Sequence, residues 1–123
     1  MIIMVKNALI GLHGGRDLVK AIVSRFQAKG YSVDITRDAE KMLDYAKGKT
    51  YDRYFMDLNL GNSNSPDVTP AINVYDVVRE RVESSEAKFV GISGNSDAVT
   101  TAQKRGIPAY RGLADFNLND FLD

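Results

Sequence analysis

Short apolar runs alternate along this chain with longer stretches of helical spacing, and this alternation restricts the possible folds more than any other feature. The short runs have the length and the flanking turn residues of β-strands. They cover residues 8–12, 31–36, 53–60, 88–93 and 107–111. Because a helix-length segment separates each strand from the next, we expect right-handed crossovers and a parallel sheet with helices on both faces.

The segments between the strands carry apolar residues on one helical face. The first, residues 16–29, places Leu18, Ala21, Ile22 and Phe26 on its face, and Gly30 follows as a stop signal. The other expected helices are one capped by Asp38 that ends at Gly48, one with Ala71, Val74, Tyr75, Val78 and Val82 on its face, residues 98–105, and a short last helix within residues 115–122. Residues 61–70 are rich in Gly, Asn, Ser and Pro and predict a loop. The whole chain, residues 1–123, is expected to form a single domain.

Composition excludes several classes of function. The chain has no Cys, which excludes a disulfide framework, a thiolate zinc site and a cysteine nucleophile. His13 is the one histidine, so a histidine metal cluster is excluded. Sixteen basic and sixteen acidic residues give a formal net charge of zero, which argues against nucleic-acid binding. The apolar start, residues 1–12, is interrupted by Lys6 and is too short to span a membrane, so we expect a cytoplasmic protein.

Polar residues follow the expected strands, where open parallel sheets form their sites. Asp57 interrupts the third strand, and a carboxylate there is costly unless it is paired, solvated or used. It is either a structural aspartate at a strand end or an acceptor for a phosphoryl group. Ser93 and Tyr110 follow on the fourth and fifth strands, and the turn His13-Gly14-Gly15-Arg16 follows the first.

Three segments carry a resemblance to a known family. Residues 55–60 (FMDLNL) resemble the phosphoacceptor strand of response-regulator receiver domains, the CheY-like modules of two-component signalling. Residues 90–95 (VGISGN) resemble the family's fourth strand, and residues 102–110 resemble the helix and strand that end at its switch aromatic. The resemblance implies a flavodoxin-like, doubly wound sheet of five parallel strands in the order 2-1-3-4-5, and a signalling module that is not an enzyme.

The resemblance also implies roles for individual residues. Asp57 would accept the phosphoryl group, and Asn59 would offer a backbone carbonyl to Mg²⁺. Ser93 would hydrogen-bond a phosphoryl oxygen, and Tyr110 would move inward with it as a switch pair. Sensor kinases or downstream proteins would be the partners, and a homodimer would form through the fourth helix, the fifth strand and the last helix.

The chain departs from the family pattern at three places. Receivers place an acidic pair after the first strand, but Leu12 and His13 stand there, and Asp57 with one carbonyl gives Mg²⁺ too few ligands. Leu113 takes the position of the family lysine, which the planar guanidinium of Arg111 does not simply replace. The loop at 61–70 is longer than usual. We therefore predict no firm cofactor and only a weak Mg²⁺ site at Asp57 and Asn59.

These departures leave alternatives for function. The favoured hypothesis is an atypical, stand-alone receiver that acts by protein–protein contact, with Asp57 as candidate phosphoacceptor. The second is a fully phosphorylation-driven regulator in which His13 and Arg16 supply positive charge and the turn at Gly14 and Gly15 faces phosphate. A third is a flavodoxin-like phosphate or cofactor site at that turn, for which the glycine pair alone is weak evidence.

Simpler structural roles also stay open for these residues. His13 is then a loop histidine with a local hydrogen bond. Ser93 caps the turn before the fourth helix, and Tyr110 is a half-buried strand aromatic. The turn at Gly14 and Gly15 is then only a tight connection between strand and helix.

Overall fold

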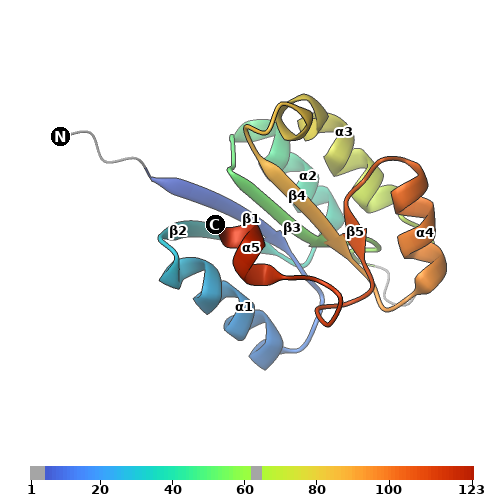
Figure 1. The fold of residues 1–123 in the computed structure, drawn as a ribbon, viewed down its shortest axis with the longest axis horizontal. Helices are drawn as coiled ribbons and strands as arrows, with labels where there is room; N and C mark the ends of the chain where they lie inside the picture. Colours follow the sequence, from blue (N-terminus) through green and yellow to red (C-terminus); the bar gives the residue numbers. More distant parts are fainter. Residues whose placement is uncertain (1–4, 62–64) are drawn as a thin grey trace.

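The computed structural model describes residues 5–61 and 65–123 of the chain. Strands and helices alternate, and the sheet lies between two layers of helix (Figure 1). In chain order the elements are β1 (Lys6–Gly11), α1 (Arg16–Ala28), β2 (Tyr31–Thr36), α2 (Ala39–Gly48), β3 (Arg53–Asp57), α3 (Thr69–Glu83), β4 (Lys88–Ile92), α4 (Ser96–Lys104), β5 (Ala109–Tyr110) and α5 (Leu118–Leu122).

All neighbouring strands are parallel, and their order is β2-β1-β3-β4-β5. This confirms the flavodoxin-like topology that the sequence resemblance implies. β1 pairs with both β2 and β3, so the chain reverses its direction of winding beside β1. Because every strand runs the same way, the residues that follow β1, β3, β4 and β5 meet at one edge of the sheet.

Two separate apolar layers hold the helices to the sheet. On one face α1 and α5 cover a cluster centred on Phe26, Phe55 and Phe121, whose rings are 6.0–6.3 Å apart. On the other face α2, α3 and α4 cover a cluster that includes Met42, Leu58 and Val74. Each large side chain that is fully buried in this way contributes about 1.5–3 kcal/mol.

The buried face of α1 differs from the expected one. Ile22 and Phe26 are buried as predicted, but Ala21 is exposed and Leu18 is 47% exposed. Val19 and Val23 pack against the core in their place, because positions 19, 22, 23 and 26 form the continuous stripe at helical spacing. Leu18 lies instead over the turn at Gly14, where its Cδ2 would be 3.2 Å from an added Cβ.

Most of the other helix signals are confirmed. The side chain of Asp38 accepts a hydrogen bond from the backbone N–H of Lys41 and caps α2. Gly30 and Gly106 follow α1 and α4 with positive φ, a conformation that glycine adopts without steric cost. On α3 the predicted residues Ala71, Val74, Tyr75 and Val78 are buried, and Val82 is partly buried against the same core.

Several element boundaries differ from those expected. β3 ends at Asp57, and residues 58–60 form a turn in which Leu58 and Leu60 are still buried, so apolar character alone does not mark the end of the strand. The predicted loop at 61–70 is shorter because α3 begins at Thr69, and its residues 62–64 lie outside the described part of the chain. The expected apolar start, residues 1–12, likewise has its first four residues outside that part.

The last third of the chain is less regular than the sequence predicts. β5 has two residues and not five, because Pro108 lacks the N–H that would continue its pairing with β4. α4 begins at Ser96, two residues before the predicted start, because Asn95 supplies the cap. α5 covers only residues 118–122, since Asn117 starts the helix there.

Candidate functional site

The residues predicted to converge do lie at one edge of the sheet. Asp57 is the last residue of β3 and pairs in register with Ile92, the residue before Ser93. Ile92 pairs in turn with Tyr110, and the N–H of Ser93 donates to the Tyr110 carbonyl at 3.2 Å. His13 follows β1 on the other side of Asp57. Neighbouring parallel strands thus place these four residues side by side.

Asp57 is held by the residue that follows β1. Its Oδ2 accepts a hydrogen bond from the backbone N–H of His13 at 2.8 Å, and His13 Nε2 lies 3.4 Å from the same oxygen. The Asp57 side chain is only 14% exposed. Burial raises the pKa of Asp57 above its ordinary value, while the backbone N–H and the imidazole of His13 act in the opposite direction.

The two ring nitrogen atoms of His13 have different surroundings. Nε2 faces Asp57, whereas Nδ1 is buried and has no hydrogen-bond partner among the described residues. A buried N–H without an acceptor costs about 1–3 kcal/mol. Nδ1 is therefore a buried polar atom for which the described residues supply no partner.

The turn after His13 leads directly into α1. Gly15 is the N-cap residue and makes no side-chain cap. Arg37, at the end of β2, donates from Nη2 to the carbonyl of Gly14 at 2.9 Å and braces this turn, a role that the sequence pattern did not indicate. The side chain of Arg16 is exposed, and within residues 5–61 and 65–123 it forms no ion pair with Asp57. Arg16 therefore does not supply charge to Asp57 in this structure.

Asn59 and Ser93 have structural bonds at the site. Asn59 is buried, and its amide donates to the carbonyl of Ser65 at 2.8 Å, which ties the turn after β3 to the start of the next loop. Ser93 is buried, and its Oγ accepts the N–H of Asn95 at 3.0 Å. This bond caps the turn before α4, as the simpler interpretation of Ser93 predicts, while the helix N-cap is Asn95, whose Oδ1 accepts two N–H groups. An Asn followed by Ser-Asp is the sequence signal that identifies this cap.

Tyr110 is 40% exposed, and its ring centroid lies 5.3 Å from that of Phe116. It has the half-exposed position that the simpler interpretation predicts for a strand aromatic. Arg111 and Leu113 follow Tyr110, and both are exposed. Arg111 forms no ion pair in the described part of the chain, so this segment places no cation beside Asp57.

The residues around Asp57 do not fit a Mg²⁺ site. Within residues 5–61 and 65–123 no group of three His, Asp or Glu side chains is placed to hold a metal. Mg²⁺ needs oxygen lone pairs in octahedral geometry, but the groups that face Oδ2 of Asp57 are nitrogen atoms of His13, one of them an N–H donor. The weak Mg²⁺ site predicted at Asp57 and Asn59 therefore has no support from this donor set.

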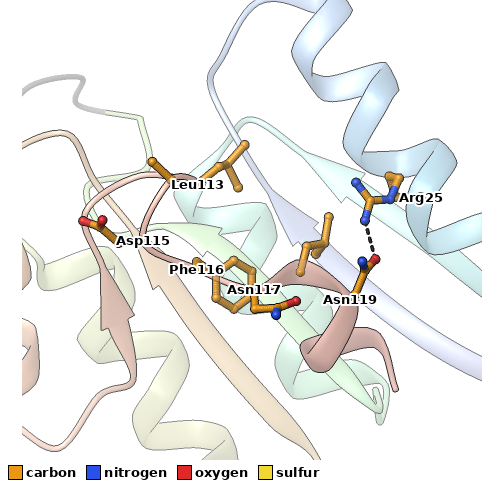
Figure 2. A pocket seen from close by; sticks show the side chains of 8 residues that line it. Arg25, Leu113, Asp115, Phe116, Asn117 and Asn119 are labelled. Atoms are coloured by element: carbon orange, nitrogen blue, oxygen red, sulfur yellow. Dashed lines mark hydrogen bonds between the residues drawn. The ribbon is translucent and has the colours of Figure 1, made fainter.

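Figure 2 shows a surface hollow of the molecule. It is formed by Arg25 of α1 and by residues 113–119, and the Arg25 guanidinium donates to Oδ1 of Asn119 at 2.5 Å. His13, Asp57 and Ser93 do not line it. The hollow is therefore distinct from the cluster that the sequence singled out.

No protein-family model and no curated protein sequence matches the chain. Solved structures do match. A CheY-like receiver domain protein from Methanospirillum hungatei has 18% identity and a TM-score of 0.68, over 97% of this chain and 89% of that one. A response regulator from Burkholderia pseudomallei, with a phosphorylated aspartic acid and calcium, has 19% identity and a TM-score of 0.70 over 95% of this chain, which spans 64% of that protein.

A third match comes from the complex of histidine kinase ThkA with response regulator TrrA of Thermotoga maritima, with 14% identity and a TM-score of 0.63, over 94% of this chain and 93% of that one. The chain has the fold of response-regulator receiver domains. None of the helices in the described residues has the length and apolar character needed to cross a membrane.

Proposed function

We propose that this chain is an atypical receiver-like signalling module of two-component type. It acts through contact with other proteins in the cytoplasm, performs no catalysis of its own, and does not depend on a Mg²⁺-driven phosphorylation switch. The receiver fold supports the signalling class, since several neighbours with that fold are response regulators. Fold alone does not fix function, so the proposal depends on the site.

One observation carries the atypical part of the proposal. The carboxylate of Asp57 is bound by His13, and within residues 5–61 and 65–123 it has no second acid beside it and no ion pair with a lysine. Phosphoryl transfer depends on neutralising the charge that develops on the transferred group. Removing single electrostatic groups of this kind costs about 10²- to 10³-fold in rate. Without them, Asp57 should accept phosphoryl groups slowly at best.

The experiment incubates the protein with acetyl phosphate, with and without Mg²⁺, and measures the intact mass and the mobility on a phosphate-affinity gel. Asp57→Asn is the control variant. We expect no stoichiometric adduct, with or without Mg²⁺. A stoichiometric adduct that forms under either condition and is absent from Asp57→Asn would contradict the proposal.

The phosphorylation-driven alternative has one observation in its favour. Oδ1 of Asp57 accepts no hydrogen bond from the described residues, so one carboxylate oxygen stays free to attack phosphorus. Ser93, buried at the end of β4, is close to it in register. Under this alternative the same mass measurement gives an adduct on Asp57, so a single experiment separates the two functions.

The proposed contact surface is formed by α4, β5 and α5. Tyr110 is exposed there, and next to it lies an apolar groove lined by residues that include Phe89, Pro108 and Phe116. Phe121 of the five-residue helix α5 also lines this groove. A sensor kinase, a downstream protein or a second copy of the chain are the partners proposed for it.

The homodimer is tested by the molar mass from light scattering across a concentration series. A rise towards twice the chain mass of 13.6 kDa that Tyr110→Glu abolishes would support the homodimer. A mass that stays monomeric at high concentration would restrict the surface to other proteins.

A further inference from the structure

Among residues 5–61 and 65–123, His13 provides both groups that contact Oδ2 of Asp57. A carboxylate that is mostly buried must have a partner, because moving it out of water without one is costly. Here the partner is one residue: the backbone N–H of His13 at 2.8 Å and its Nε2 at 3.4 Å. Both belong to the segment that follows β1, the strand next to β3.

The placement of the ring shows which of its nitrogen atoms is used. Nε2 faces Asp57, while Nδ1 is buried without a partner in the described residues. A ring oriented to satisfy both nitrogen atoms would not leave one of them buried and unpaired. Its position is therefore explained by the contact with Asp57.

This arrangement is unfavourable for a cation. A divalent ion binds to oxygen lone pairs, and an N–H group that points at the same oxygen competes with it. Oδ2 is already in contact with the two His13 groups, and only Oδ1 remains without a hydrogen bond from the described residues. A single carboxylate oxygen is a poor site for Mg²⁺, which needs several such ligands.

We propose that His13 occupies the side of Asp57 from which a divalent cation would bind, and that this edge of the sheet binds no divalent cation because residue 13 offers nitrogen groups in place of a carboxylate. The inference deepens the proposed function, because it names the residue that makes the module independent of Mg²⁺. It rests on the proposed function only for the importance of Asp57, and its test measures cation binding and stability without any signalling activity.

The test compares the wild type with His13→Asp, His13→Asn and Asp57→Asn. His13→Asp replaces the imidazole by a second carboxylate beside Asp57 and keeps the backbone N–H. His13→Asn is the matched control, because it also removes the ring but adds no charge. Bound Mn²⁺ is measured by electron paramagnetic resonance, and urea unfolding is measured with and without Mg²⁺.

We expect the wild type, His13→Asn and Asp57→Asn to bind no Mn²⁺ and to unfold alike with and without Mg²⁺. His13→Asp should bind Mn²⁺, and its unfolding equilibrium constant should fall about tenfold when Mg²⁺ is at about ten times its Kd. If His13→Asp is unfolded without metal, folding on addition of Mg²⁺ supports the inference equally.

Two results would overturn the inference. One is wild-type protein that binds Mn²⁺ in a manner lost in Asp57→Asn. The other is a folded His13→Asp protein that binds no cation. If His13→Asp does not fold under either condition, the backbone amide resonance of His13 in the wild type is followed by NMR during titration with Mg²⁺. A chemical shift that millimolar Mg²⁺ leaves unchanged supports the inference. A saturable change in that shift refutes it.

These results are separate from the phosphorylation experiment. A wild type that binds no cation yet forms an Asp57 adduct with acetyl phosphate would contradict the proposed function and leave the role of His13 intact. A wild type that binds Mg²⁺ but forms no adduct would overturn the role of His13 and leave the proposed function intact.

Discussion

The backbone N–H of His13 donates a 2.8 Å hydrogen bond to Oδ2 of Asp57 and thereby joins the ends of β1 and β3. The bond places a mostly buried carboxylate against a single neighbouring residue at the edge where receiver-fold proteins carry their site. It is also a link whose contribution depends on pH, because burial raises the pKa of Asp57.

The first prediction concerns the charge of Asp57. Because its pKa is raised above the ordinary value of 3.8, the folded protein keeps this proton at pH values where the unfolded chain has lost it. The stability that Asp57 contributes is therefore greatest at pH values below its ordinary pKa. It is lost as the pH rises through the raised pKa of the folded state. Asp57→Asn keeps an oxygen for the His13 N–H without a charge to bury, so it should stabilise the protein by about 1 kcal/mol at pH 7. Urea unfolding at pH 7 and near pH 4 measures this, and the advantage should shrink at the lower pH. A variant less stable than wild type at pH 7 would contradict the prediction.

The second prediction concerns the hydroxyl of Tyr51, which donates to Oδ2 of Asp34 at 2.6 Å. Burial and this bond hold the pKa of Tyr51 well above its ordinary value, and the same bond, together with Lys49, lowers the pKa of Asp34. Tyr51→Phe should destabilise the protein by about 1–2 kcal/mol near neutral pH.

Because the pKa of Asp34 is lowered, the stability it contributes is present at pH values above its ordinary pKa. That stability is lost as the pH falls through the lowered pKa of the folded state. The loss caused by Tyr51→Phe should therefore diminish under acid conditions. Tyr45→Phe is the control, because Tyr45 lies on the neighbouring helix, is 40% exposed, and its hydroxyl makes no hydrogen bond within the described residues. Equal effects of the two substitutions would argue against the bond.

The third prediction concerns the packing of Gly91 in β4. A Cβ at this position would overlap the side chain of Leu58, which is fully buried in the turn after β3. Gly91→Ala should cost about 1–3 kcal/mol, because a dense core has no room for the added methyl group. Gly94→Ala, three residues later, meets nothing within 4 Å and should change stability by less than about 0.5 kcal/mol. Thermal unfolding of both variants checks this, and similar melting temperatures would contradict it.

The fourth prediction concerns the attachment of α5. Arg53 Nε donates to the carbonyl of Phe121 at 2.6 Å, and its guanidinium lies over the ring of the same residue. Arg53→Met should cost about 1–2 kcal/mol and increase hydrogen exchange in residues 118–122. Arg25→Met removes only the exposed contact with Asn119 and should cost less than about 0.5 kcal/mol. Unchanged exchange of these amides in Arg53→Met would show that α5 is held by other contacts.

Sequence reasoning predicted the elements whose residues pack with a regular period. The bounds of β2 agree with expectation, although its burial does not alternate, since Ile35 is exposed and Thr36 is buried. The buried face of α3 agrees with expectation, because helical spacing is a local property of the chain. It was wrong on the face of α1, where two neighbouring stripes were both apolar and only contact with the sheet distinguished Val19 from Leu18.

The site divides in the same way. The placement of Asp57, Ser93 and Tyr110 at one edge follows from parallel strands, so the sequence was sufficient to predict it. The bond from His13 to Asp57 spans 44 positions, and no local pattern encodes it. The side-chain amide of Asn59 ties down the loop at Ser65, a bond that no local pattern predicts, while a metal role for its backbone carbonyl stays a prediction.

The amino-acid sequence by itself therefore determined the alternating elements, the parallel sheet and the residues at its edge, because these depend on periodicity and on the direction of the strands. The tertiary structure alone decided which nitrogen atoms face the Asp57 carboxylate, how short β5 and α5 are, and which apolar stripe of α1 is buried. Those features depend on distances between residues far apart in the chain, which are set when the sheet and its two helical layers pack together.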